Sequence, residues 1–175
     1  MHPLVDEAMK KAAIAWLSNA APLVGPERRP TTVGAARPFA VWCLWLDGAL
    51  YVVSGPGEQP APGLAAASTV DVTVRGDHGG QILTWPASVR QVEPGSEEWD
   101  RVAPQLAGKR LNASGTAEHT VARWAAECRV TCLSPSGEPS ALGATLPDDS
   151  GAAPPPLTPA TRRPAKPFRL HRVRR

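Results

Sequence analysis

Two apolar runs joined by Asp47-Gly48 constrain the fold of this chain more than any other feature. The first run covers residues 39–46 (FAVWCLWL) and the second covers residues 49–54 (ALYVVS). Asp-Gly between two such runs is a strong signal for a β-hairpin, because both residues tolerate positive φ in a two-residue turn. The first run has no polar face, so we expect both of its faces to be covered, one by a closed barrel and the other by a partner subunit.

Two further stretches predict strands that extend this β-core. Residues 69–75 (TVDVTVR) alternate between valine and polar residues, which is the pattern of a strand with one buried face. Residues 81–92 predict a longer strand in which Pro86 marks a bulge, a bend or an edge, because proline has no N–H to donate to a ladder. The Gly/Pro-rich segment 55–63 lies between these strands and the hairpin, and we expect this loop to carry the function.

Helices are expected on both sides of the strands. Residues 3–18 have apolar side chains at helical spacing and predict one amphipathic helix. Ser96 and Thr116 are predicted to be N-caps of two later helices, and Pro104 is predicted to kink or end the first of them. Residues 128–133 predict the last strand. This order of elements indicates a mainly β fold, a β-barrel with helical additions, and excludes an alternating β/α chain.

Composition divides the chain into one domain, residues 1–136, and a Pro-rich tail, residues 137–175. The last fourteen residues carry seven of the 19 Lys and Arg, which leaves twelve basic against 16 acidic residues, a net charge of −4, in the rest. The basic pI therefore belongs to the tail, which cannot bury enough surface to offset its chain entropy and is expected to be disordered. We expect no nucleic-acid partner beyond weak contact by this tail. Residues 20–38 predict a long loop.

Several classes of protein are not expected from the sequence. No apolar run approaches the length of a membrane span, and the N-terminus lacks the basic-then-apolar order of a signal peptide, so a cytoplasmic location is expected. The three cysteines, Cys43, Cys128 and Cys132, are interpreted as free thiols. The four histidines have no ligand spacing with one another or with the cysteines, so no metal site is expected.

From about Met9 to Leu133 the chain resembles the pyridoxamine 5'-phosphate oxidase-like split β-barrels, which bind FMN or the deazaflavin F420. The likeness lies in residues 41–48, 50–54, 64–72 (LAAASTVDV), 81–92 and 129–135 (RVTCLSP). The resemblance implies a six-stranded Greek-key barrel of the FMN-binding type and a homodimer with cofactor sites at its interface. It also implies an oxidoreductase that acts on a small organic substrate by hydride transfer.

Four residues are assigned to cofactor binding. By position in the family, Ser54 matches a Thr or Ser that contacts the cofactor phosphate, and Gln81 matches a glutamine that hydrogen-bonds the flavin. Gly55 belongs to a possible anion nest of backbone N–H groups in the loop, and Gln59 lies at the expected mouth of the site. No catalytic residue is identified, because in flavin chemistry the hydride moves between cofactor and substrate.

Two departures from the family pattern leave an alternative open. Gln59-Pro60 replaces an Arg-Lys pair of the FMN enzymes, and residues 39–46 contain no basic side chain. A phosphate dianion favours charge-assisted donors. The alternative to an FMN- or F420-dependent enzyme is therefore a split-barrel binding or interaction module that has lost cofactor affinity. A haem-binding relative of the same fold is a third class, for which no axial-ligand histidine is placed.

Overall fold

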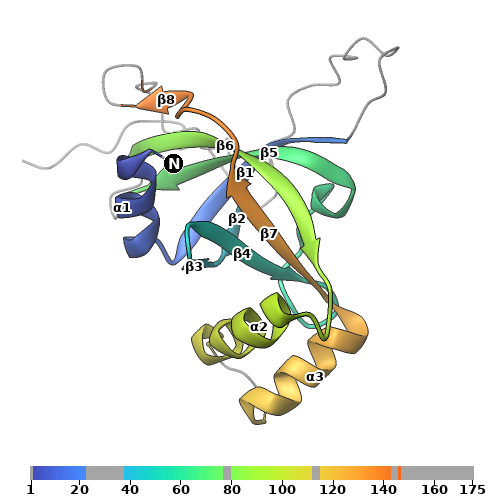
Figure 1. Ribbon diagram of the computed structural model, residues 1–175. Helices are drawn as coiled ribbons and strands as arrows, with labels where there is room; N and C mark the ends of the chain where they lie inside the picture. The colour runs from blue at the N-terminus through green and yellow to red at the C-terminus, as the bar shows by residue number, and fades with distance from the viewer. Residues whose placement is uncertain (1, 23–37, 77–79, 112–114, 143–145, 147–175) are drawn as a thin grey trace, which may run out of the picture.

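A computed structural model describes residues 2–22, 38–76, 80–111, 115–142 and 146. The strands form a nearly closed antiparallel barrel, α1 lies at one end of it, and α2 and α3 lie together at the other (Figure 1). In chain order the elements are α1 (Pro3–Lys11), β1 (Ile14–Pro22), β2 (Phe39–Trp42), β3 (Leu44–Leu46), β4 (Ala49–Ser54), the short 3-10 helix η1 (Leu64–Ala66), β5 (Ala67–Arg75), β6 (Gln81–Val92), α2 (Glu97–Lys109), α3 (Ala117–Glu127), β7 (Arg129–Pro135) and β8 (Ala141–Leu142).

The apolar stretch 39–46 closes the barrel. Its first half, β2, pairs with β1 and its second half, β3, pairs with β4, so the two halves stand at opposite ends of the strand order β2-β1-β5-β6-β7-β4-β3. Cys43 joins them, and its backbone N–H donates to the Ala13 carbonyl at 3.1 Å. With β2 and β3 taken as one strand, the described residues form six barrel strands, and β8 is added beside β6. The predicted split barrel is confirmed.

The turn of the predicted hairpin has the expected geometry. Asp47 and Gly48 have φ values of 50° and 79°, as a type I′ turn requires. Leu46 then pairs with Ala49. The Asp-Gly signal therefore predicted both the turn and its register.

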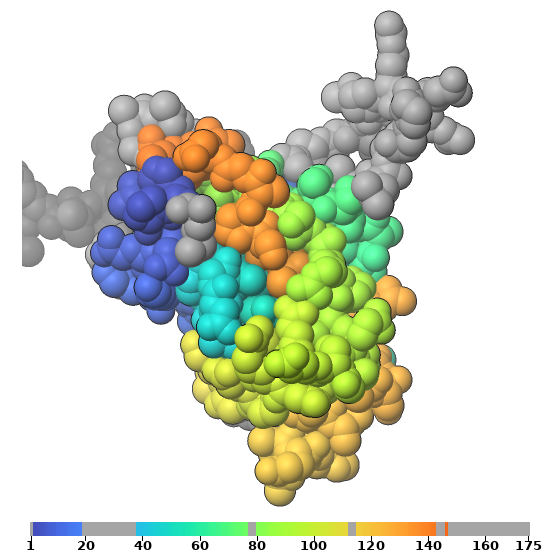
Figure 2. All heavy atoms as spheres, in the orientation of Figure 1, coloured from blue at the N-terminus to red at the C-terminus, as the bar shows by residue number. Residues whose placement is uncertain are grey.

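The hairpin lies between two hydrophobic cores. Leu50 and Val52 of β4 point into the barrel, where they pack with the valines of β5. Tyr51 and Val53, on the opposite face of β4, pack against α2 and α3, which form a layer below the hairpin (Figure 2). Burial of each such side chain contributes about 1.5–3 kcal/mol. On the apolar stretch itself, Leu44 is buried in this second core and Trp42 and Leu46 are partly buried against it, while Ala40 is exposed. Helices of the same chain therefore cover part of the face for which a partner subunit was expected.

The N-terminal segment differs from the single helix predicted over residues 3–18. Helix α1 ends at Lys11, Ala12 is extended with φ −84° and ψ 122°, and β1 begins at Ile14. Trp16 and Leu17 fit the helical spacing, yet they lie on β1, where Leu17 is fully buried. The pairing of β1 with both β2 and β5 outweighs the helical pattern. Strand β1 also occupies the first residues of the loop expected over 20–38, and residues 23–37 lie outside the described residues.

The two later helices begin where the sequence predicts. Ser96 Oγ accepts from the Trp99 N–H at 3.1 Å, and Thr116 Oγ1 accepts from the His119 N–H at 3.3 Å. Pro104, however, neither ends nor breaks α2, which continues to Lys109. Pro104 is on the exposed side of the helix, so the carbonyl that loses its intrahelical donor has access to water. The prediction that the helix ends at Pro104 was wrong, and the alternative, a kink there, stays a prediction.

Pro86 lies at a change of partner along β6. Residues 87–92 of β6 pair with β7, whereas Leu83 and Thr84 pair with β8. Between them, the Pro86 carbonyl accepts from the Ser136 N–H at 3.0 Å. The proline therefore occupies a local edge, as its missing N–H requires. Because β8 follows Ser136, ordered pairing continues beyond the predicted domain boundary, while most of the expected tail lies outside the described residues.

Candidate functional site

The loop after β4 contributes to two pockets. The first, called the Trp42 pocket, has a volume of about 510 Å³ and is lined by Trp42, Gln59 and the C-terminal end of α2. The second, called the Ser54 pocket, has a volume of about 490 Å³ and is lined by Ser54, Gly55 and Arg129. Glu58 lines both pockets. These volumes are in the range of small-molecule sites.

Glu58 fixes the loop to both helices. Its carboxylate is 1% exposed. Arg110 Nε lies 2.8 Å from both of its oxygens, Trp124 Nε1 donates to it at 2.9 Å, and Arg123 forms a further ion pair with it. The same arginines donate to loop carbonyls, Arg110 to Gly57 at 2.9 Å and Arg123 to Pro56 at 2.7 Å. The loop is therefore held at several points, as a preformed site requires.

The charge of Glu58 is compensated inside this network. Burial raises the pKa of its carboxyl group, but the hydrogen bonds from Arg110, Trp124 and Arg123 together outweigh burial and lower the pKa below its usual value. Glu58 is therefore ionised at neutral pH. With two guanidinium groups as partners, it adds no uncompensated negative charge to either pocket.

Gln59, predicted to bind a cofactor, has its side chain engaged with the barrel. Its amide nitrogen donates to the carbonyls of Trp42 at 2.9 Å and Val53 at 3.1 Å, and its amide oxygen accepts from the Trp42 N–H at 2.7 Å. Both amide hydrogens are thus used on the backbone. Gln59 lines the Trp42 pocket, where it holds β2 in place beside the loop.

Gly55 is required where the loop leaves β4. Its φ is +143°, and a Cβ atom there would lie 2.9 Å from the Cα of Cys128. Cys128 Sγ in turn lies 3.6 Å from the Pro56 carbonyl. Burial raises the pKa of the Cys128 thiol, which the nearby Arg123 only partly offsets. Backbone packing, not thiolate chemistry, is the role that these contacts support for Cys128.

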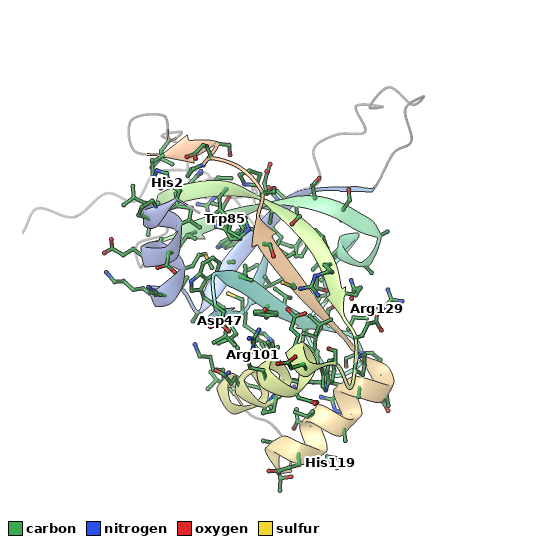
Figure 3. All side chains as sticks on the ribbon, in the orientation of Figure 1. His2, Asp47, Trp85, Arg101, His119 and Arg129 are labelled. Carbon is green, nitrogen blue, oxygen red and sulfur yellow. The ribbon has the colours of Figure 1, made fainter. Side chains whose placement is uncertain are left out.

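Ser54 and Gln81, the other predicted site residues, lie near opposite ends of β6. Ser54 pairs with Arg129, next to the pairing of Val130 with Val92 at the end of β6, and Arg129 is at the end of the barrel that carries α3 (Figure 3). Gln81 begins β6, and its amide donates to Thr84 Oγ1 at 2.8 Å. The 12 residues of β6 span about 35 Å along the strand. Within one chain Ser54 ends β4, Gly55 and Gln59 lie in the loop that follows it, and Gln81 lies apart.

Other site types find no support in the part of the chain that the structure describes. It contains no group of three or more His, Cys, Asp or Glu residues that could hold a metal ion. His2 caps α1, and His119 lies on the outer half of α3 (Figure 3). Neither histidine lines the two pockets. No helix among these residues is long and apolar enough to cross a membrane.

Sequence reasoning missed the network around Glu58 that builds this site. Glu58, Arg110 and Arg123 were not paired, because 52 and 65 residues separate Glu58 from the two arginines. A single acid inside a loop otherwise composed of Gly, Pro, Ala and Gln was the available signal. Arg129 was considered only as part of a strand, although it is the basic residue beside Ser54.

The barrel, its closing strand and its helices define a split β-barrel of the pyridoxamine 5'-phosphate oxidase-like type at the level of fold. No protein-family model and no curated protein matches the sequence. Among solved structures, the haem storage protein HutZ from Vibrio cholerae matches with a TM-score of 0.54 and 15% identity over 79% of this chain and 92% of HutZ. The conserved hypothetical protein Rv2991 from Mycobacterium tuberculosis matches with a TM-score of 0.52 and 14% identity over 78% of this chain and 82% of Rv2991.

Flavin-related proteins are also among the structural matches. A FAD-binding protein from Mesorhizobium loti has a TM-score of 0.49 and 12% identity over 78% of this chain and 91% of that protein, and an F420 reductase has a TM-score of 0.48. The common fold rests on the matches with TM-scores above 0.5, HutZ and Rv2991, and identities this low establish nothing finer. The resemblance inferred from the sequence is confirmed at that level.

Proposed function

We propose that this chain binds a flavin or deazaflavin, FMN or F420, and uses it as an oxidoreductase acting on a small organic substrate by hydride transfer. The observation that carries the proposal is the Ser54 pocket. It combines a hydroxyl group, the loop backbone at Gly55 and the guanidinium of Arg129 on one side of a fold that flavin-binding proteins also have. Hydroxyl, amide and guanidinium donors are the groups that a phosphate favours.

The Ser54 pocket fits a phosphate in its donors. Arg129 supplies the cation that is absent from positions 59–60, and it stands directly opposite Ser54 in the β4–β7 pairing. Glu127 also lines the pocket and opposes an anion. Glu58 opposes an anion less strongly, because Arg110 and Arg123 compensate its charge. When bound, a flavin or deazaflavin supplies the hydride acceptor or donor, and the residues of this chain hold its phosphate and exclude water from the loop side.

The alternative is a split-barrel binding or interaction module without cofactor affinity. Two observations favour it. Both amide hydrogens of Gln59 are used on the backbone, and Glu127 lines the Ser54 pocket together with Arg129. A homodimer is part of the main proposal, because the family's cofactor sites lie between subunits. Light scattering of the full chain, with and without FMN, tests this part.

Titration of the full chain with FMN and with F420 tests the main proposal. We expect a dissociation constant below about 100 μM, roughly −5.5 kcal/mol, for one of them. Arg129→Gln should weaken this binding about tenfold. Arg101→Gln is the matched control, since Arg101 is an exposed arginine on α2 that pairs with Asp47 (Figure 3), and it should leave binding unchanged.

Three outcomes separate the candidate functions. Binding of FMN or F420 together with turnover of electron acceptors supports the enzyme. Binding of neither below 100 μM eliminates it in favour of the interaction module. Preferential binding of haemin would instead assign the chain to the haem class that the likeness to HutZ suggests, and an Arg129→Gln protein with unchanged FMN affinity would remove the Ser54 pocket from the site.

A further inference from the structure

The Trp42 pocket has features that the flavin proposal does not use. Two of the exposed large apolar side chains, Ile14 and Leu111, line it, with exposed fractions of 47% and 84%. Trp42 and Cys43 add apolar wall, and Lys109 and Arg110 add cations. A concave apolar surface with a few convergent charges is the usual form of a small-molecule site.

The lining carries net positive charge. It holds the cations Lys109 and Arg110 against one acid, Glu58, and Glu58 is already paired with Arg110 and Arg123. Lys109 has no ion-pair partner among the residues that the structure describes. Burial raises the pKa of Cys43 to about 12, so its thiol is neutral near pH 7 and adds no negative charge.

Arg110 keeps donors for a ligand. A guanidinium has five N–H groups, and Arg110 directs one to Glu58, one to the Leu111 carbonyl at 3.1 Å and one to the Gly57 carbonyl at 2.9 Å. Two remain beyond these contacts within the described part of the chain. The guanidinium is held in place by the same contacts, so little side-chain entropy is lost when it binds a ligand.

The walls of the pocket are fixed before any ligand binds. Gln59 holds both the N–H and the carbonyl of Trp42, and the Cys43 N–H is bonded to Ala13. Arg110 and Glu58 connect the loop wall to the end of α2. A preformed apolar site with cations at its edge is selective for molecules that combine an apolar body with an anionic group.

We propose that the Trp42 pocket binds a small organic carboxylate, with its apolar body against Trp42 and Ile14 and its carboxylate on Lys109 and Arg110. This proposal stands apart from the flavin proposal, because it uses the other pocket and needs no cofactor. Within the flavin proposal, the same pocket would define the class of the small organic substrate. The volume of about 510 Å³ admits a bicyclic aromatic acid or a medium-length fatty acid.

Calorimetric titration of the full chain, without flavin, tests the proposal with 2-naphthoate and decanoate as probes. At least one should bind, and 2-naphthamide, which has the same ring system without the charge, should bind more weakly. Lys109→Gln should weaken carboxylate binding about fivefold, as expected for an exposed charge. Lys10→Gln is the control, because Lys10 is also exposed but pairs with Asp6 on α1, and it should have no effect.

A blocking variant makes the test independent of charge. Ala13 is exposed on the pocket wall, so Ala13→Phe should fill the pocket and abolish binding while the circular dichroism spectrum stays unchanged. Absence of binding by both carboxylates at 1 mM, equal binding of 2-naphthoate and 2-naphthamide, or unaltered affinity in Ala13→Phe would each overturn the proposal. FMN affinity measured in Lys109→Gln should equal that of the parent chain, so failure here leaves the flavin proposal standing.

Discussion

Arg110 at the C-terminal end of α2 and Glu58 in the loop after β4 form a buried ion pair, with Arg110 Nε 2.8 Å from both carboxylate oxygens. The Glu58 side chain is 1% exposed and that of Arg110 is 21% exposed. Through this pair the helical layer determines the position of a loop that separates two pockets. The pair therefore connects the stability of the fold with the shape of the site.

Replacement of Glu58 by glutamine should destabilise the chain by about 2–4 kcal/mol, because two partly buried guanidinium groups lose their counterion. Urea unfolding followed by tryptophan fluorescence measures the change. Glu7→Gln is the control, since Glu7 forms an exposed pair with Lys11, and it should change stability by less than about 1 kcal/mol. Equal effects of the two substitutions would contradict a structural role for the buried pair.

The same carboxylate predicts a loss of stability in acid. The pKa of Glu58 in the folded chain lies below its ordinary value of 4.5, so its contribution is present above pH 4.5 and is lost as the pH falls through the lowered pKa. The free energy of unfolding of Glu58→Gln should therefore depend less on pH than that of the parent between pH 5 and pH 2. Parallel curves for the two proteins would show that Glu58 does not titrate with folding.

Substitution of Gly55 by alanine should destabilise the chain by about 2–4 kcal/mol, because a Cβ would meet the Cys128 backbone at 2.9 Å and the residue has φ +143°. Gly108→Ala is the matched control. Gly108 lies inside α2 with nothing within 4 Å of a new Cβ, so alanine there should stabilise the chain by about 0.5–1 kcal/mol. Thermal unfolding of the two variants should shift in opposite directions.

Gln59→Glu should be more damaging than Gln59→Leu. A carboxylate at this position would face the Trp42 and Val53 carbonyls that now accept from the amide, and it offers no donor to either. We expect a loss of about 2–3 kcal/mol for glutamate and a smaller loss for leucine, which removes the mismatch along with the hydrogen bonds. Chemical denaturation of both variants checks the order, and the reverse order would mean that the glutamine is not a backbone clamp.

Truncation after Ser136 should lower stability by about 1–2 kcal/mol, since it removes β8 and the 2.9 Å bond from the Ser140 N–H to the Thr84 carbonyl. The tail is expected from its composition to have no core of its own. Truncation after residue 146, which keeps β8, should accordingly leave the melting temperature unchanged. A lowered melting temperature of the chain that ends at residue 146, with none of the chain that ends at Ser136, would contradict the role of β8 pairing with β6.

Local patterns predicted most of the elements but not their surroundings. Asp47-Gly48 predicted the turn, the alternation of residues 69–75 predicted the buried face of β5, and Ser96 and Thr116 predicted two helix starts, because each of these signals acts within a few residues. Trp16 and Leu17 were assigned to a helix, because spacing alone does not separate a short apolar strand from a helical stripe. Only the pairing of β1 with two other strands resolves that choice.

The candidate site was predicted in outline only. Ser54 was assigned to the end of a strand and Gly55 and Gln59 to the loop after it, and they lie there, but Ser54 and Gln59 line different pockets. Gln81 lies at the far end of β6, and the side chain of Gln59 is used on the backbone. The assignment of these four residues to a cofactor therefore stays a prediction, and the residues that shape the loop, Glu58 above all, depend on partners far away in the sequence.

The sequence alone determined a hairpin turn at Asp47-Gly48 between two apolar runs and a β-core around it, because turn chemistry and side-chain alternation are local properties. Tertiary structure decided how that hairpin is used. Cys43 divides its first strand between β1 and β4 and so closes the barrel, and α2 and α3 of the same chain cover part of the face that a partner was expected to cover. It also decided that Glu58 meets Arg110 and Arg123. Such contacts depend on how the barrel closes and how the helices pack, and no pattern within a short stretch of sequence contains that information.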